Sequence, residues 1–117
     1  MTYPSRAEVW LVDLGLAAKV RPCVVVSSRI ADADRALITL VPHTTSVRRT
    51  AYEANLKVEF LKPGAFDAQG IVTVPVAHAV RLMGRLRPDD MKAIEAVLCR
   101  WLGLPCHEMG ESAATKQ

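Results

Sequence analysis

The sequence is poor in aromatic residues, in cysteine and in long apolar runs. Its 117 residues include two Trp, two Tyr, two Phe and three Cys. No apolar stretch approaches the roughly 20 residues that a membrane-spanning helix needs, and the first ten residues show no basic region followed by an apolar core. These absences argue against a membrane span and a secretory leader, so we expect a soluble, cytoplasmic protein that makes no membrane contact.

The cysteines and histidines do not form a recognisable metal or disulfide motif. Cys23, Cys99 and Cys106 contain no CxxC spacing and are odd in number, so we expect buried apolar filler or incidental thiols rather than a disulfide framework. The histidines are well separated, and the adjacent Cys106 and His107 cannot complete a tetrahedral site alone. Glycine-rich phosphate loops, GxSxG and HExxH are also missing. We therefore predict neither a metal nor another cofactor.

The overall composition fits one small globular domain. Half of the residues are hydrophobic, and the formal net charge of +3 permits a polyanionic partner without demonstrating one. No repeat or linker interrupts the chain. We assign residues 1–107 to a single domain and expect residues 108–117, which lack a core-forming pattern, to be a flexible tail.

Short β-prone segments dominate the first three quarters of the chain. The run from Cys23 to Val26 is too short and too β-branched for a helix, and Pro22 sits at the first position of a strand, where proline is tolerated. Residues 55–61 alternate apolar and polar side chains, which is typical of a half-buried antiparallel strand. The predicted strands span residues 8–14, 22–28, 37–42, 55–61, 71–76 and 81–86.

The last element changes to a helical period. Apolar residues from Met91 to Leu102 recur at helical spacing, Pro88 suits the first helical position, and Gly103 is well placed to end the helix. About six short strands followed by one helix predict a mainly β fold, a small closed or half-open barrel with the helix packed on it.

Two polar features at strand ends are the best candidates for chemistry. Arg21 precedes the second predicted strand, and "PHTTS" (residues 42–46) ends the third. A guanidinium offers a planar, permanently charged pair of donors to a phosphodiester, and a hydroxyl adds a neutral donor. Such a site could cleave RNA, because the 2′-hydroxyl of the substrate supplies the attacking oxygen. Solvated strand ends remain the alternative for both features.

The order of "AEVWLVDL", "VRPCVVVSS", "VPHTTS" and a Leu-rich helix ending in "WLGL" resembles the PemK/MazF family of toxin-antitoxin ribonucleases over residues 6–104. The resemblance implies an SH3-like barrel, a homodimer, and metal-independent, sequence-selective cleavage of single-stranded RNA to 2′,3′-cyclic phosphate and 5′-hydroxyl ends. It also implies a cognate antitoxin protein as partner. The catalytic arginine of the family falls on Arg21 and the catalytic threonine on Thr44, with Thr45 as the neighbouring alternative.

Strand alternation complicates the assignment of His43. In a regular strand, His43 and Thr45 share one face and Thr44 points to the other, so His43 and Thr44 should not both enter one site. By its usual pKa, His43 is the natural general base. We take Thr44 as the catalytic residue, with His43 as a second candidate.

Basic residues offer candidate contacts to RNA phosphates. Arg48 and Arg49 are favoured because they directly follow the hydroxyl-rich segment, and Lys19 and Arg81 are further candidates. Each of the remaining basic residues considered, Lys57, Arg85 and Arg87, is also consistent with an ordinary solvated surface.

Two other functions stay open from the sequence. A gyrase-binding toxin of the same fold would act without catalysis, and "RWLGL" faintly resembles the C-terminal ending of such toxins. A catalytically inactive RNA-binding barrel is the other alternative, because "TVPVAHAV" replaces an acid-Gln-x-Arg segment common in the family.

Overall fold

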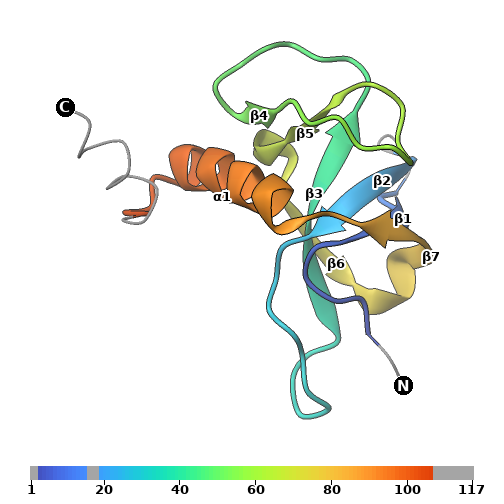
Figure 1. Cartoon of the computed structure of the whole chain (residues 1–117). Coiled ribbons are helices and arrows are strands. Elements are labelled where there is room, and N and C mark those ends of the chain that lie inside the picture. Colours follow the sequence, from blue (N-terminus) through green and yellow to red (C-terminus); the bar gives the residue numbers. More distant parts are fainter. Residues whose placement is uncertain (1–2, 16–18, 107–117) are drawn as a thin grey trace.

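The computed structural model describes residues 3–15 and 19–106, which form strands, two short 3₁₀ helices and one α-helix (Figure 1). In chain order the elements are β1 (Glu8–Asp13), β2 (Val20–Val25), β3 (Leu37–Thr44), β4 (Glu53–Ala54), β5 (Ala65–Asp67), η1 (Ala68–Gly70), β6 (Val72–Pro75), η2 (Val76–His78), β7 (Ala79–Arg85) and α1 (Pro88–Leu102).

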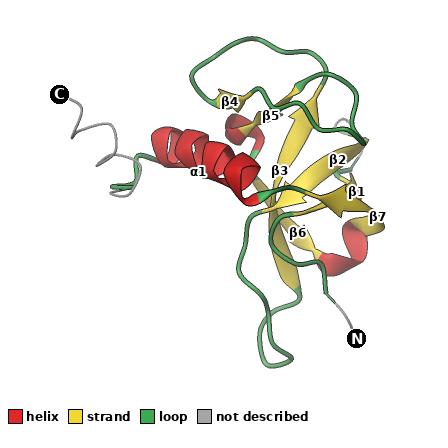
Figure 2. Ribbon diagram, in the orientation of Figure 1, coloured by secondary structure: helices red, strands yellow, loops and turns green. Residues whose placement is uncertain are grey.

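The strands form one antiparallel sheet around the long strand β3. The order is β4-β5-β3-β2-β1-β7, and β6 also pairs with β3. The predicted fold class is confirmed, a mainly β domain with a C-terminal helix (Figure 2). Within the described residues, however, there are seven strands rather than about six, and β4 and β7 do not pair, so the sheet is open rather than a closed barrel.

The second half of β2, from Cys23 to Val25, is buried on both faces, which explains its unbroken apolar run. Val24 contributes to the core under α1, whereas Cys23 and Val25 contribute to a second core on the opposite face. All three are at most 1% exposed. Successive residues of a strand point to opposite faces, so a strand between two cores must be apolar at every position.

Helix α1 closes the larger core as the sequence predicts. Its apolar stripe buries Met91, Ile94 and Val97, and full burial of a side chain such as Ile94 stabilises the fold by about 2 kcal/mol. Pro88 is the first residue, and Gly103 ends the helix in the left-handed region at φ 68°. The helix packs beside η1 and β4 (Figure 1).

The predicted strand over residues 55–61 is wrong. The local strand is the two-residue β4, and residues 55–58 are irregular before a turn. Leu56 and Val58 still pack against the core, but Phe60 is 37% exposed. The alternation arises because an irregular segment also buries some of its side chains, and periodicity alone cannot distinguish it from a strand. Strand β5, which follows this segment, was missed.

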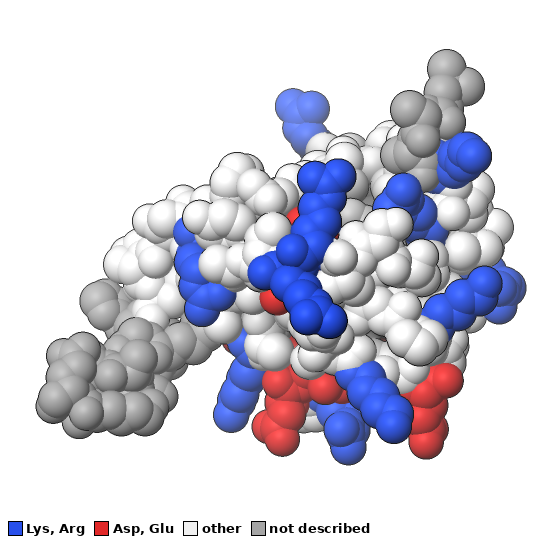
Figure 3. Space-filling model, turned by 90° about the horizontal axis from the view of Figure 1, so that it is seen from above, with Lys and Arg blue, Asp and Glu red and all other residues white. Residues whose placement is uncertain are grey.

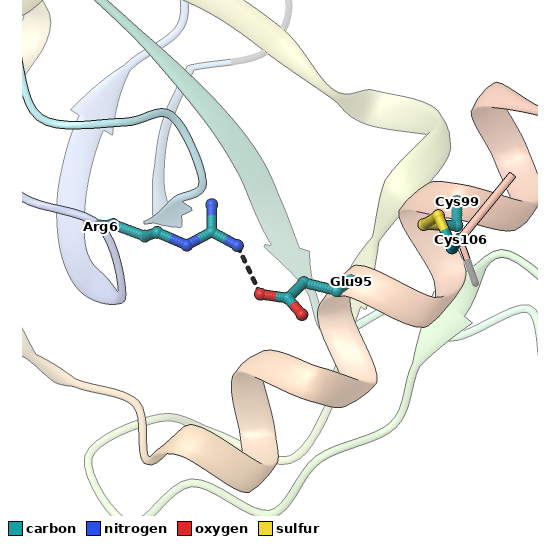
Figure 4. The surroundings of a disulfide bond; sticks show 4 residues. All are labelled: Arg6, Glu95, Cys99 and Cys106. Carbon is teal, nitrogen blue, oxygen red and sulfur yellow. Dashed lines mark hydrogen bonds and ion pairs between the residues drawn. A yellow bond between two sulfur atoms is a disulfide. The ribbon is translucent and has the colours of Figure 1, made fainter. Parts of the chain in front are cut away.

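The expectation of buried, unpaired thiols is confirmed for Cys23 and wrong for Cys99 and Cys106. Cys99 and Cys106 form a disulfide at the C-terminal end of α1, with Cα atoms 6.0 Å apart, while Cys23 is free and buried (Figure 4). In the same view Arg6 pairs with Glu95 at 2.5 Å and ties the N-terminal segment to the helix.

The expected flexible tail, residues 108–117, lies outside the described residues, as does His107. Among the residues that the structure describes, no helix has the length and apolar character needed to cross a membrane.

Candidate active site

Adjacent strands bring Arg21 and Thr44 together. In the register of β2 and β3, Cys23 lies opposite Pro42. Continued by two residues, the same register places Arg21, at the start of β2, opposite Thr44, at the end of β3. Both side chains line one open cavity of about 480 Å³, a size typical of ligand sites. The structure therefore juxtaposes the two residues that the sequence singled out.

The cavity has a wall of strands and a wall of loop. Strands β2 and β3 and the turn after β3 supply hydroxyls, Arg21 and His43, and β7 supplies Met83. The turn of residues 60–62 supplies the facing wall. The lining residues are Arg21, Pro22, His43, Thr44, Thr45, Ser46, Phe60, Leu61, Lys62 and Met83.

The hydroxyl of Thr44 is already oriented. Its Oγ1 accepts a hydrogen bond from the backbone N–H of Ser46 at 3.0 Å. A hydroxyl has one hydrogen and two lone pairs, so an accepted bond leaves its own hydrogen available for donation. Thr44 is half-buried, whereas Thr45 is exposed on the turn. Thr44 is therefore the better held of the two predicted hydroxyls.

His43 also lines the cavity, so the expectation that His43 and Thr44 are mutually exclusive is wrong. The β3 strand pairs with β5 at these two residues, where His43 lies opposite Phe66 and Thr44 opposite Ala65. The end of a strand at a cavity can contribute residues from both of its faces. The imidazole packs edge-on against Phe66, with ring centroids 5.1 Å apart.

His43 is a buried polar residue with an unpaired atom. It is 5% exposed, and its Nε2 has no hydrogen-bond partner within the described structure. Burial lowers the pKa of His43 from its ordinary value of 6.5, because the charged imidazolium loses hydration. The imidazole is therefore neutral, and its buried Nε2 would have to become accessible before it could exchange a proton with a ligand in the cavity.

Gly64 makes this arrangement possible. A Cβ at this position would lie 2.2 Å from the carbonyl oxygen of Thr44 and 2.7 Å from Cε1 of His43. Only glycine allows the chain after the loop wall to lie this close to the end of β3.

Cys23 does not supply a nucleophile. Burial raises the pKa of its thiol to about 12, an effect that the nearby Arg21 charge only partly opposes. The thiol is therefore protonated at neutral pH and unreactive.

The predicted RNA-binding cations lie outside the cavity lining. Lys19 is in the loop before β2, Arg81 is on β7, and Arg48 and Arg49 are on the loop after β3; all four are exposed. The carboxylate of Glu53 accepts the backbone N–H groups of Arg48 and Arg49, which orders that loop. Figure 3, which views the face formed by these loops, shows basic side chains across its middle and acidic ones along one edge.

Sequence reasoning missed the cation and the aromatic ring that do line the cavity, Lys62 and Phe60. Phe60 lies within the segment that was mistaken for a strand, where it was assigned to an apolar face, and Lys62 directly follows that segment. The turn signal "KPG" directly after Leu61 was the available hint that the chain bends back toward the site.

Within the described residues, no group of three or more His, Cys, Asp or Glu side chains is arranged to hold a metal ion. The site as described is built from a guanidinium, hydroxyls, an imidazole and an ammonium group.

Solved structures similar to this chain include two mycobacterial proteins. An endoribonuclease from a mycobacterial species superposes with a TM-score of 0.76 at 26% identity, covering 90% of this chain and 96% of that one. An endoribonuclease in complex with its cognate antitoxin, also mycobacterial, gives 0.76 at 26% identity, covering 87% and 97%. A MazE–MazF structure from Deinococcus radiodurans has the same fold, with 0.74 at 15% identity over 89% and 99%.

A family model matches residues 5–102, which is most of the chain and contains every lining residue of the cavity. The matched model describes the PemK-like, MazF-like toxins of type II toxin-antitoxin systems. With this match, the open β fold and the Arg21–Thr44 cavity, the chain belongs to the PemK-like, MazF-like toxin family.

Proposed function

We propose that this protein is the toxin of a type II toxin-antitoxin pair and acts as an endoribonuclease on single-stranded RNA. The observation that carries the proposal is the shared cavity of Arg21 and Thr44, supplied by neighbouring strands. The cavity binds the scissile phosphodiester, and the cognate antitoxin is the protein partner. We further propose a homodimer in the cytoplasm.

The reaction is an internal transfer within the RNA. The 2′-oxygen attacks the adjacent phosphorus, the O2′–P bond forms and the P–O5′ bond breaks. The 2′-hydroxyl loses its proton, and the leaving 5′-oxygen gains one, so no water or cofactor is consumed. The products are a 2′,3′-cyclic phosphate and a 5′-hydroxyl. Because the nucleophile belongs to the substrate, the protein needs to supply only alignment, charge stabilisation and proton transfer.

The residues divide these tasks. Arg21 holds the non-bridging oxygens and stabilises the negative charge that develops on them, since a guanidinium presents a planar, charged pair of donors. Thr44 donates its hydroxyl hydrogen to the same group, with Thr45 as the neighbouring candidate. His43 is the candidate for taking the 2′-proton, because it lines the cavity and burial keeps its imidazole neutral; this role requires the buried Nε2 to become accessible when RNA binds.

The test identifies the chemical groups at the ends of the RNA fragments. Purified protein is incubated with a long RNA in excess EDTA, and the fragments are examined for cyclic phosphate and 5′-hydroxyl termini. A 2′-deoxy copy of the same sequence serves as the control and should remain intact. Cleavage that requires a metal, or fragments with 5′-phosphates, would contradict the mechanism. Intact RNA together with stalled gyrase would instead favour a non-enzymatic toxin.

A further inference from the structure

A second cavity adjoins the first, and Phe60 lines both. Its volume is about 320 Å³, and it lies between the segment of residues 57–60 and the chain from Arg85 to Asp90. The two cavities thus meet at one aromatic ring. Because a single-stranded chain that enters the first cavity must leave it again, the ring stands on a possible path for the substrate.

The ring of Phe60 packs against strand β7. It lies directly against Gly84 of β7, where an added Cβ would come within 2.5 Å of Cε2 and 2.6 Å of Cζ. The residue is nevertheless 37% exposed, so part of the ring is accessible from solvent. A ring that packs on one face and is partly accessible to solvent is the kind of platform on which an unpaired base stacks.

The second cavity carries positive charge around this ring. Lys57, Arg85 and Arg87 line it, against the carboxylates of Glu59 and Asp90. Arg85 pairs with Glu8 and Arg87 with Asp90, each at 3.8 Å, and the two arginine side chains are 62% and 81% exposed. Long ion pairs with an exposed arginine contribute little to stability, so either guanidinium can turn to a phosphate at low cost.

We propose that this second cavity is a nucleotide subsite for single-stranded RNA, in which a base beside the scissile phosphate stacks on Phe60 and the next phosphate is held by Arg85 and Lys57. The inference rests on the proposed function and extends it from the reacting phosphate to a neighbouring nucleotide. Phe60 acts in binding and takes no part in the chemical step. Gly84 is the positioning residue that sets the ring.

The test measures binding separately from cleavage. The probe is a fluorescent, mixed-sequence 2′-O-methyl oligoribonucleotide, which binds but lacks the attacking hydroxyl. Phe60→Leu keeps apolar volume and removes the ring, so affinity should fall about tenfold, whereas Phe60→Trp should retain it. Gly84→Ala keeps the ring but displaces it and should weaken binding to a similar extent. Thermal unfolding of each variant establishes that it is folded.

Arg85→Gln should reduce the slope of log affinity against log salt by about 0.7, the value for one phosphate contact to a single strand. Arg35→Gln is the matched control, since Arg35 lies on the β2–β3 loop at the opposite end of the molecule and should leave the slope unchanged (Figure 1). In cleavage assays, Phe60→Leu should raise the RNA concentration for half-maximal rate and leave the saturated rate within about threefold.

Unchanged oligonucleotide affinity in both folded Phe60→Leu and Gly84→Ala would overturn the subsite. A wild-type protein that binds the probe through Phe60 but cleaves no RNA would instead refute the proposed function and leave the subsite standing.

Discussion

The two walls of the cavity are built in different ways. The strand wall places Arg21, His43 and Thr44 on β2 and β3, elements that hydrogen bonds and two cores hold in register. The loop wall places Phe60 and Lys62 on a turn without ladder hydrogen bonds. A rigid wall suits groups that must meet a reacting phosphate within a fraction of an ångström, whereas a loop suits groups that grip the rest of the chain.

The largest effect is expected from the strand wall. Arg21→Ala and Thr44→Ala should each lower the cleavage rate about 100- to 1000-fold, because each removes a donor to the charge that develops on phosphorus. Thr44→Ser should recover most of the activity. The measurement is the single-turnover rate at saturating protein.

Matched controls come from the same structure. Arg35→Ala removes a cation from the distant β2–β3 loop, and Thr39→Ala removes a threonine from the other end of β3, where it bonds to Thr73 at 2.7 Å. Both should cleave at the parental rate. If Arg21→Ala or Thr44→Ala cleaves RNA as fast as these controls, the substituted residue does not act in the chemical step.

The next effect is expected where the two walls meet. Gly64→Ala puts a Cβ against the carbonyl of Thr44 and the ring of His43, so the fold should lose about 2 kcal/mol of unfolding free energy. Cleavage by the remaining folded protein should fall by up to about 100-fold, because small misplacements of reacting groups have large effects. Denaturant unfolding and single-turnover rates provide the two measurements.

Gly103→Ala is the control that introduces backbone strain without a steric contact at the cavity. Gly103 has φ 68°, and an added Cβ meets nothing within 4 Å. This variant should lose about 1 kcal/mol through backbone strain and keep full activity. Equal activity loss in both glycine variants would show that stability, not the approach of the walls, limits cleavage.

The difference between the walls also explains what could be read from the sequence. The run of Cys23–Val26 and the hydroxyls after Val41 predicted the strand wall, because burial on both faces and strand register leave a pattern in the sequence. The segment before the loop wall has a misleading sequence pattern. Leu56 and Val58 alternate with polar residues as in a strand, but they reach the core from an irregular segment. The Cys99–Cys106 pair could not be foreseen either, since the bond depends on how the chain turns after Gly103.

The buried His43 should make the unfolding free energy depend on pH. Because burial lowers its pKa below 6.5, the unfolded chain binds a proton below that pH while the native state does not. Unfolding free energy should therefore fall as pH drops from 6.5, with a slope from this group of at most about 1.4 kcal/mol per pH unit.

His43→Leu should abolish this share of the pH dependence and leave stability at pH 7.5 unchanged or up to about 1 kcal/mol higher, because it removes an unsatisfied buried nitrogen. If His43 takes the 2′-proton, the same variant loses cleavage and with it the acid limb of the pH–rate profile. A variant that loses stability at pH 7.5 would mean that the imidazole is structural. Urea unfolding at several pH values measures the first effect.

The smallest effect is expected from the disulfide, which belongs to neither wall. Cys99 and Cys106 close a short loop at the end of α1, while the cavity is lined from β2, β3, β7 and residues 60–62. Reduction should cost at most about 2 kcal/mol of unfolding free energy and leave the cleavage rate unchanged. In the cytoplasmic location proposed above the bond would be reduced, which agrees with an activity that does not depend on it. The measurement compares cleavage rates with and without dithiothreitol, and Cys99→Ser is the variant that cannot re-form the bond.

A large drop in cleavage rate on reduction would contradict this expectation. The end of α1 contacts the loop after β3 in two places: Trp101 packs against Tyr52, and Arg100 donates to the carbonyl of Ala51. A drop in rate would therefore show that this loop, which carries Arg48 and Arg49, takes part in catalysis.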